Sequence, residues 1–369
     1  MRKQPHRREI LAAGGAIATA VTLGRWPVLL GDEPPRPGVP WLANVQQPPS
    51  QLPADAPQLP SLLADGSGGT IADLPAWKQH RVELRRAWLD FLGPLQLPRP
   101  KPRLEVLEED RPEGCIRQLV RYESEPGLPV EGYLLRPAKL TGRVPGVVAM
   151  HSTTAITIRQ PAGVEGDPED FFGLKLARLG MVAFCPRCFL WQGEGDYLQL
   201  VERFRQRHPH SLGMAKMLWD AVRAVDVLEN LPEVDAGRIG AVGHSLGAKE
   251  ALYLAAFDER IKAAVSSEGG IGLKFTNWDA PWYLGEDVKA GRWAREHHEL
   301  LALIAPRAFL LLGGDSADGD RSWPFIESAL PVYRLYGGQP ALGLLNHRRG
   351  HSVPPDAEQK TNEWLAAYL

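Results

Sequence analysis

Short apolar runs alternate with segments of helical spacing over most of the chain. The run GVVAMH at 146–151 is followed by a helical pattern near 167–179 and then by the strand-like MVAFCP. Strands of a parallel sheet are apolar on both faces because helices cover both of them. Alternation of strand and helix is typical of α/β proteins. We therefore predict a mostly parallel central sheet with helices on both faces.

The same pattern continues on both sides of this unit. One apolar stripe predicts a helix from Met214 to Leu228, and a final helix is expected from about Pro355 to Tyr368. Antiparallel strands are expected at the N-terminal edge of the sheet, over residues 103–109, 116–124 and 130–136. Further buried strands are expected at 238–243, 261–266, 308–312 and 342–345.

The first thirty residues have the pattern of a twin-arginine export signal. Arg7 and Arg8 precede a weakly apolar segment that runs from Ile10 to about Gly24, and Ala-Thr-Ala at 18–20 offers a cleavage site. The apolar part is too short and too rich in Gly, Ala and Thr to span a bilayer stably. We expect export to the periplasm or the cell exterior, with no stable membrane span afterwards.

The rest of the chain divides into an arm and one domain. Residues 31–69 are dense in Pro and lack any helical or strand period, which predicts a linker or an extended arm. The domain, 70–369, opens with a helix from Leu74 to Leu92 whose large apolar residues share related faces. An aromatic-rich segment near 270–295 lies between two strands, and we expect it to form a lid.

Composition excludes several classes of protein. Lys and Arg total 42 against 44 Asp and Glu, so the net charge of −2 offers no basic surplus for nucleic acid. Three cysteines exclude a disulfide scaffold, and no Cys or His spacing predicts zinc. We expect no metal or organic cofactor. Cys185 and Cys188 form a C-x-x-C pair without a thioredoxin-like setting, so a local disulfide and two buried thiols both remain open.

The strongest chemical signal is Gly-His-Ser-Leu-Gly at 243–247. It directly follows a predicted strand and directly precedes the helical run LGAKEALYLAA. A serine on such a tight strand-to-helix turn is exposed as a nucleophile, and the flanking glycines allow close approach of neighbouring backbone. The helix N-terminus supplies N–H donors where an oxyanion would form. We predict Ser245 as a catalytic nucleophile.

A serine hydroxyl requires a general base at neutral pH. His351 lies in RRGHSVPP, after the last predicted strand and before the final helix, where the base belongs in the chain order Ser, acid, His. His347 is the nearby competitor, and its distance from the final helix makes it the second choice. We predict His351 as the base.

Three carboxylates compete for the role of the acid that orients the histidine. Asp318 is preferred because it lies a few residues past the glycines that follow strand 308–312, where the loop can turn toward His351. Asp315 in the same loop could instead tighten the turn. Glu268, just after strand 261–266, is the third candidate, because some enzymes of comparable architecture carry the acid one strand earlier. The sequence leaves the choice open.

The remaining site residues follow from position along the chain. The oxyanion donors are expected from the N–H of Leu246 and from that of Ser152 or Thr153, which follow the first parallel strand. Trp278 and Trp282 in the predicted lid are expected to contact the substrate, because aromatic faces stack on sugars or aryl groups. His244, within the serine motif, is a further expected substrate contact.

From about Pro102 onward the chain resembles the dienelactone-hydrolase-like and acetyl-xylan-esterase-like group of α/β-hydrolases, with a distant likeness to glucuronoyl esterases. The resemblance rests on VVAMHSTT with QPAG after it, GHSLG, LLALIAPRAFLLLGG, DSADGD with PVYRLYG, and RRGHSVP. It implies the α/β-hydrolase fold, Ser245 as nucleophile, His351 as base and an acid from the DSADGD loop. The chain departs from lipase-like relatives, which have an HGGG run, and from dienelactone hydrolases, which carry Cys where it has Ser245.

We therefore expect a serine esterase that cleaves a small-molecule or carbohydrate ester through an acyl-enzyme. The export signal, the fold analogy and the lid aromatics suggest that it removes acyl groups from polysaccharides. A prolyl-oligopeptidase-like peptidase shares the motif and chain order, but no propeller-sized repeat region precedes the domain. A non-catalytic binding protein on the same fold is the alternative from another class. The sequence does not define the oligomeric state.

Overall fold

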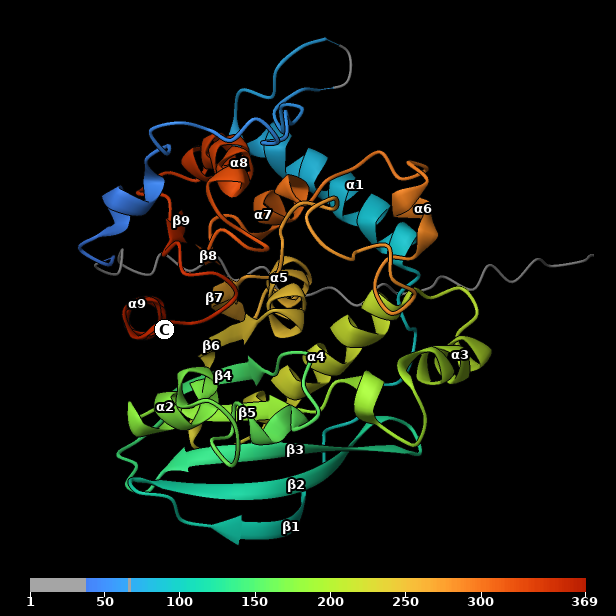
Figure 1. Ribbon diagram of the computed structural model, residues 1–369, viewed down its shortest axis with the longest axis vertical. Helices are drawn as coiled ribbons and strands as arrows, with labels where there is room; N and C mark the ends of the chain where they lie inside the picture. Colours follow the sequence, from blue (N-terminus) through green and yellow to red (C-terminus); the bar gives the residue numbers. More distant parts are fainter. Residues whose placement is uncertain (1–37, 66–67) are drawn as a thin grey trace, which may run out of the picture. The chain divides into compact units, whose positions relative to one another are not determined.

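The computed structural model describes residues 38–65 and 68–369, so the predicted export signal and the first part of the arm lie outside the described residues. The centre is a nine-stranded sheet of order β1-β2-β3-β5-β4-β6-β7-β8-β9 (Figure 1). β1, β2 and β3 pair antiparallel, β3 meets β5 antiparallel, and the strands from β5 to β9 in this order run parallel. The predicted mostly parallel sheet with an antiparallel N-terminal edge is confirmed.

Each predicted strand is present, with small shifts at its ends. The strands are β1 Glu105–Asp110, β2 Cys115–Glu125, β3 Leu128–Pro137, β4 Val144–Met150, β5 Val182–Pro186, β6 Val234–His244, β7 Ile261–Ser267, β8 Ala308–Gly313 and β9 Leu342–Asn346. The α-helices are α1 Leu74–Leu92, α2 Phe172–Arg178, α3 Tyr197–Arg207, α4 Gly213–Glu229, α5 Leu246–Phe257, α6 Glu286–Lys289, α7 His298–Ile304, α8 Trp323–Leu335 and α9 Pro355–Tyr368.

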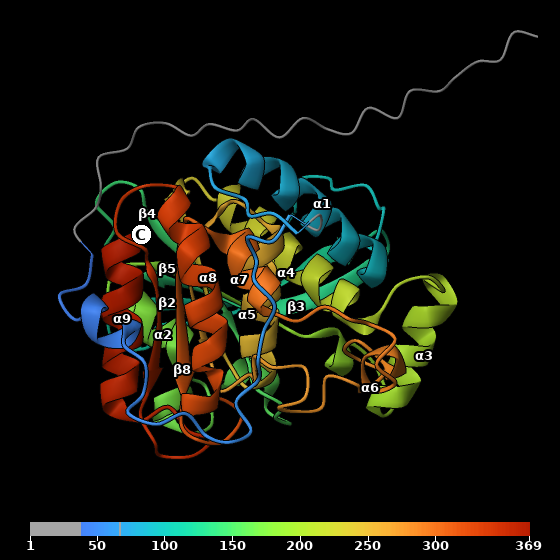
Figure 2. The same cartoon turned by 90° about the horizontal axis from the view of Figure 1, so that it is seen from above.

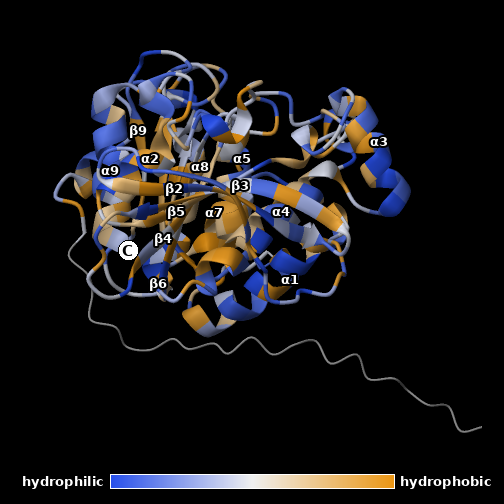
Figure 3. Ribbon diagram, turned by 90° about the horizontal axis from the view of Figure 1, so that it is seen from below, coloured by the Kyte–Doolittle hydropathy of each residue, from blue (hydrophilic) through white to orange (hydrophobic). Residues whose placement is uncertain are grey.

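The central strands are buried on both faces because two sets of helices cover them. Along β4, Val148 and Met150 belong to the core shared with α4, α5, α7 and α8, while Val147 and Ala149 belong to the core shared with α2 and α9. Successive strand side chains point to opposite faces, so a continuous apolar run supplies both cores. Figure 2 shows the two helical layers, and Figure 3 shows hydrophobic strands inside hydrophilic outer helix surfaces.

Helix α1 forms where the apolar spacing predicts it. Asp73 caps its first turn by accepting the N–H of Ala76, and the helix ends at Gly93 in the left-handed region, with φ 62°. Its buried face carries Trp77 and Trp88, neither of which has any exposed surface.

Helix α3 was not predicted, because its stripe of apolar residues is short. The helix begins after a glycine-rich loop with a capping box formed by Asp196 and Gln199.

The described part of the Pro-rich arm, residues 38–65, lies against the domain. A 3-10 helix, η1 Leu42–Gln46, buries Leu42 and Val45. Gln46 Nε2 donates to the carbonyls of Pro340 and Leu342 at 2.6 and 2.8 Å. Trp41 Nε1 donates to Glu363 on α9 at 2.6 Å. The bond from Gln46 to Leu342 engages a backbone group at the start of β9, the edge strand of the sheet, which would otherwise lack a partner on that side.

Two features are absent from the described residues, a membrane-spanning helix and a cluster of metal ligands. No helix in residues 38–65 and 68–369 is both long enough and apolar enough to cross a membrane. Within the same residues, no group of three or more His, Cys, Asp or Glu side chains is arranged to hold a metal ion.

Candidate active site

Ser245 occupies the turn between β6 and α5, with φ 58° and ψ −113°. Non-glycine residues rarely adopt a positive φ, and strain of this kind is concentrated at functional sites. Two glycines make the turn possible. A Cβ on Gly243 would lie 2.3 Å from the backbone of Gly247, and one on Gly247 would lie 2.5 Å from the Met150 carbonyl oxygen. The predicted strand–turn–helix setting of the serine motif is therefore present.

His351 lies in the loop between β9 and α9. Its Nδ1 is 3.2 Å from Oε2 of Glu268, the residue that follows β7. Glu268 is buried while His351 is 43% exposed at its side chain, so the pair joins a buried carboxylate to an imidazole that solvent or substrate can reach. An Nδ1–H directed to a carboxylate leaves Nε2 as the acceptor that a general base needs. Within the described residues, the Ser245 side chain has no hydrogen-bond partner.

Glu268 is held by the loop that follows β8. Its carboxylate accepts the N–H groups of Gly314, Ala317 at 2.7 Å and Asp318 at 3.4 Å. Its backbone has φ 54°, a conformation that residues other than glycine rarely adopt and that is concentrated at functional sites. A buried carboxylate is stable only with such partners. Oε1 thus accepts the N–H groups of Gly314 and Asp318, while Oε2 accepts that of Ala317 and also lies within hydrogen-bond distance of His351.

The structure does not bring Asp318, the preferred acid, to His351. Asp318 has no exposed surface and accepts the N–H groups of Gly270 and Ile271 at 2.7 and 2.8 Å and the hydroxyl of Ser322 at 2.9 Å. Burial raises the pKa of this carboxyl. The loop turns toward β7 because its own N–H groups bind Glu268, and this turn carries the Asp318 side chain away from His351.

Asp315 takes a third position, on the outside of the same loop. Its side chain is 44% exposed and accepts Asn346 Nδ2 at 2.6 Å, with Arg348 3.6 Å away. Its backbone is also left-handed, with φ 63°. Both facts fit a turn residue that secures the end of β9, and within the described residues no hydrogen bond joins it to His351.

The backbone just after Glu268 is fixed by buried side chains from several elements. Lys249 Nζ donates to the Gly269 carbonyl at 2.5 Å, and Trp278 Nε1 donates to that of Gly270 at 2.7 Å. His297 Nδ1 lies 2.7 Å from the Ile271 carbonyl. Together with the two bonds to Asp318, these contacts engage the three carbonyls from Gly269 to Ile271 and the N–H groups of Gly270 and Ile271, and they restrain the backbone next to Glu268.

The two other histidines of this region differ from His351 in burial. His244 is buried, with Nδ1 3.1 Å from Ser267 Oγ and its ring centroid 4.6 Å from that of His351. Burial and the neighbouring His351 lower the pKa of His244 to about 3, so the ring stays neutral. His244 therefore packs against His351 as a buried, neutral ring, which corrects the expectation that it contacts the substrate. His347 Nδ1 instead accepts the N–H of Arg349 at 3.1 Å.

The loop after β4 narrows the choice of oxyanion donor. The N–H of Ser152 already donates to Gln160 Oε1 at 3.2 Å. Within the described residues, the N–H of Thr153 makes no hydrogen bond, and Thr153 is exposed. The N–H of Leu246 is in the first turn of α5, where N–H groups lack partners inside their own helix. Thr153 and Leu246 thus offer the two free donors.

His151 fixes the shape of this loop. Its Nδ1 is 2.7 Å from the Ser152 carbonyl and its Nε2 accepts the N–H of Cys188 at 3.1 Å. Accepting at Nε2 requires the neutral ring, and burial lowers the pKa of His151 to about 4. The structure therefore gives His151 a supporting part beneath the oxyanion loop.

The two lid tryptophans are placed very differently. Trp278 has no exposed surface, and Lys249 Nζ lies 3.9 Å from its ring centroid. It cannot stack on a substrate, which corrects the expectation, because its indole N–H is needed inside to bind the Gly270 carbonyl. Trp282 is half-buried, and its ring centroid lies 5.7 Å from that of Tyr197 on α3. The segment predicted to form a lid thus places Trp278 in the core and leaves Trp282 half-buried.

Cys185 and Cys188 are separate, buried thiols. Burial raises the pKa of both above the usual value for a thiol, which disfavours the reactive thiolate. Of the two forms left open by the sequence, the structure has two buried thiols.

Glu250, one turn into α5, is a buried carboxyl that no pattern in the sequence singles out. Burial raises the pKa of Glu250 from 4.5 to about 8. Between these values the unfolded chain has released a proton that the folded chain retains, so the free energy of unfolding falls as pH rises. We expect Glu250→Gln to lose less stability than the native protein between about pH 5 and about pH 8 in urea unfolding. Glu202→Gln, on the exposed face of α3, is the control that should leave the pH dependence unchanged.

Comparisons with known proteins agree with this architecture. The sequence profile of the dienelactone hydrolase family matches residues 130–281. A Bacillus subtilis protein with the provisional name hydrolase YtaP is 28% identical over 310 residues, 77% of this chain and 100% of that protein. A 4-O-methyl-glucuronoyl methylesterase of Cerrena unicolor is 30% identical over 145 residues, which cover 32% of this chain and 30% of that protein.

The likeness in structure extends further than the likeness in sequence. A solved structure of a glucuronoyl esterase from Solibacter usitatus matches 87% of this chain and 100% of its own, with a TM-score of 0.68 at 19% identity. The nine-stranded sheet, the serine turn after β6 and this match together define the fold of the chain as that of the α/β-hydrolases.

Proposed function

We propose that this protein is a serine esterase in which Ser245, His351 and Glu268 hydrolyse carboxylic esters. The observation that carries the proposal is the 3.2 Å contact between His351 Nδ1 and Glu268 Oε2, at the same sheet edge as the strained turn of Ser245. Nucleophile, acid and base follow β6, β7 and β9 of one parallel sheet, in which β6 and β7 are neighbours and β8 lies between β7 and β9. Ligand chemistry in such sheets lies at the carboxyl ends of the strands.

The proposed reaction is acyl transfer in two steps. Ser245 Oγ attacks the ester carbonyl as His351 Nε2 takes its proton, and Glu268 stabilises the imidazolium through Nδ1. The N–H groups of Leu246 and Thr153 hold the oxyanion. His351 then protonates the leaving alcohol, and a water molecule, deprotonated by the same ring, releases the acid from Ser245.

The proposed substrate class is the esters of carbohydrates. Support comes from the names of the similar proteins, which include a 4-O-methyl-glucuronoyl methylesterase and a glucuronoyl esterase. Esters of uronic acids are therefore the first substrates to test, and acetylated sugars are the second. The export signal that the sequence predicts at 1–30 fits work on a polymer outside the cytoplasm, and we include export by the twin-arginine route in the proposal.

The test combines turnover with covalent labelling. We expect the mature protein to hydrolyse p-nitrophenyl acetate and the methyl ester of glucuronic acid, and to react with a fluorophosphonate at Ser245, as located by peptide mass spectrometry. A prolyl-oligopeptidase-like peptidase would instead cleave a proline-containing peptide anilide and spare the esters. A folded protein that neither turns over these esters nor accepts the label would be a binding protein on this fold, which would overturn the proposal.

A further inference from the structure

Side chains hold the loop after β4 at two successive peptide groups. The N–H of Ser152 donates to Oε1 of Gln160 at 3.2 Å, and the carbonyl of Ser152 lies 2.7 Å from Nδ1 of His151. Because Nε2 of His151 accepts the N–H of Cys188, Nδ1 carries the hydrogen and donates it to that carbonyl. The peptide group before Ser152 and the peptide group after it are therefore both restrained.

These bonds determine the direction of the Thr153 N–H. The carbonyl of Ser152 and the N–H of Thr153 belong to one planar trans peptide group, in which the C=O and the N–H point in opposite directions. Because the carbonyl is directed to His151, the N–H of Thr153 is directed away from that ring. This N–H is one of the two donors proposed for the oxyanion, and such a donor is effective only when it is aimed at the developing charge.

The side chain of Gln160 extends from a well-restrained backbone. Gln160 is buried and follows the 3-10 helix η2 Thr157–Arg159, and its own N–H donates to the first carbonyl of that helix at 3.1 Å. Just beyond it, Arg117 Nη1 donates to the carbonyls of Ala162 and Gly163 at 2.9 and 2.8 Å. Gln160 can therefore act as a fixed support for the residues that precede η2.

Asp170 selects the orientation of the Gln160 amide. An amide has a donor end and an acceptor end, so it can accept the N–H of Ser152 in only one of its two orientations. Nε2 of Gln160 donates to Oδ2 of Asp170 at 2.8 Å, which leaves Oε1 for Ser152. Burial and the neighbouring Asp167 and Glu169 raise the pKa of Asp170 to about 6, so the carboxyl is ionised at about pH 8 and can only accept.

We propose that Gln160 and Asp170 are positioning residues of the oxyanion hole, which act through Ser152 to aim the N–H of Thr153 at the ester oxygen. The inference rests on the proposed esterase function and deepens it, because it assigns two residues outside the proposed Ser-His-Glu triad to the same reaction. An oxyanion exists only in the transition state and the tetrahedral intermediate. A misdirected donor therefore weakens the binding of these species and leaves the general base unchanged.

Gln160→Met tests the support directly. Methionine keeps the length of the side chain but provides neither the amide oxygen for Ser152 nor the amide N–H for Asp170. We expect kcat/KM for p-nitrophenyl acetate to fall by about a hundredfold at about pH 8, the effect of a small misplacement in an active site. Inhibition by phenylboronic acid, which forms a tetrahedral adduct with a serine nucleophile, should weaken by the same factor. The pH at which kcat/KM falls to half should stay at its native value, because the His351–Glu268 pair is unchanged.

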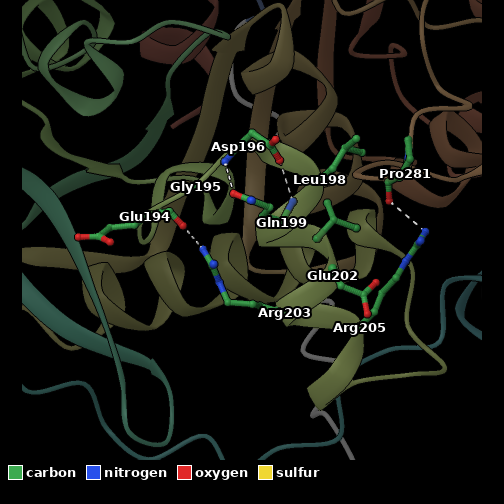
Figure 4. Close-up of a pocket in the computed structure, with 10 residues that line it drawn as sticks. Glu194, Gly195, Asp196, Leu198, Gln199, Glu202, Arg203, Arg205 and Pro281 are labelled. Carbon is green, nitrogen blue, oxygen red and sulfur yellow. Dashed lines mark hydrogen bonds between the residues drawn. The ribbon is translucent and has the colours of Figure 1, made fainter.

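Two substitutions of Asp170 distinguish the hydrogen bond from packing. Asp170→Asn keeps an oxygen that can accept from Gln160, so it should retain most of the native kcat/KM. Asp170→Leu has a similar size but no acceptor, and it should lose about tenfold. Glu169→Gln is the matched control, because it removes a neighbouring carboxylate that, within the described residues, is not bonded to Gln160. Glu202→Gln, in the surface hollow along α3 (Figure 4), is the second control. Both controls should turn over at the native rate.

The outcomes distinguish the inference from the esterase. A parallel loss of turnover and of phenylboronic acid affinity in Gln160→Met and Asp170→Leu, with near-native values in Asp170→Asn, supports the inference. Native kcat/KM in folded Gln160→Met, equal losses in the two Asp170 variants, or unchanged phenylboronic acid affinity where turnover falls would overturn it and leave the esterase standing. A native chain that shows neither ester turnover nor fluorophosphonate labelling would overturn the esterase, and the inference with it.

Discussion

Ser245→Ala is expected to abolish ester hydrolysis, with a fall in kcat on the order of a millionfold, as for loss of the nucleophile in another serine hydrolase. In this variant the N–H groups of Leu246 and Thr153 can still polarise the ester carbonyl, and the His351–Glu268 pair can still accept a proton. No other hydroxyl lies at the turn after β6, so no nucleophile remains there to attack the carbonyl. Steady-state hydrolysis of p-nitrophenyl acetate measures the effect, and fluorophosphonate labelling should be lost with it.

Ser245→Gly provides a control that separates loss of chemistry from loss of structure. Ser245 has φ 58°, which alanine must also adopt and which glycine adopts without strain. Both variants should be inactive, yet Ser245→Gly should be more stable than Ser245→Ala by about 1 kcal/mol in urea unfolding. Substantial ester turnover by either folded variant would show that another residue is the nucleophile.

The serine motif could be predicted because all of its determinants are local. Gly243, Ser245 and Gly247 lie within one turn, and the clashes that a Cβ would cause at either glycine involve that turn and the adjacent β4. The sheet could be predicted for a similar reason, since apolar runs of strand length report burial on both faces. His351 followed from chain order, since it lies in the loop between the last strand and the final helix.

The carboxylate that contacts His351 could not be chosen from the sequence because that contact depends on how two loops meet. Glu268 and Asp318 each follow a strand and each lie near glycines, so their local patterns are alike. The structure distinguishes them through an exchange of hydrogen bonds: Glu268 accepts N–H groups from the loop that carries Asp318, and Asp318 accepts N–H groups from the segment that follows Glu268. Hydrogen bonds between two loops whose residues are fifty positions apart produce no periodic pattern in the sequence, so they could not be predicted from it.

The oxyanion donor and the lid tryptophans illustrate the same limit. Whether Ser152 or Thr153 keeps a free N–H is decided by the side chain of Gln160, eight residues further on. Trp278 and Trp282 are only four residues apart in a segment without a period, yet one is fully buried and the other half-buried. Aromatic residues in irregular segments occur both in cores and in ligand sites, so only the three-dimensional surroundings show which role a given tryptophan has.

Glu268→Gln is expected to lower kcat by about ten-thousandfold, while Asp318→Asn lowers it far less. Of the three candidate acids, only Glu268 makes a hydrogen bond to His351 within the described residues, and an amide there would stabilise neither the correct tautomer nor the imidazolium. This reverses the order that the loop position of Asp318 suggests. Asp315→Asn, on the exposed side of the loop, should have a small effect on kcat, since its partners are Asn346 and Arg348.

Asp318→Asn is a matched control for Glu268→Gln because the two carboxylates are alike in burial and in the number of hydrogen bonds that they accept, and only Glu268 is bonded to His351. Both are fully buried, and each accepts three hydrogen bonds from the other's loop or its own. Each amide would set an NH₂ group against N–H donors, so both variants should lose stability by a comparable amount, on the order of 1–3 kcal/mol. The difference in kcat between them, measured where both are folded, therefore reports the contact with His351. A larger loss of kcat in Asp318→Asn than in Glu268→Gln would return the role of the acid to Asp318.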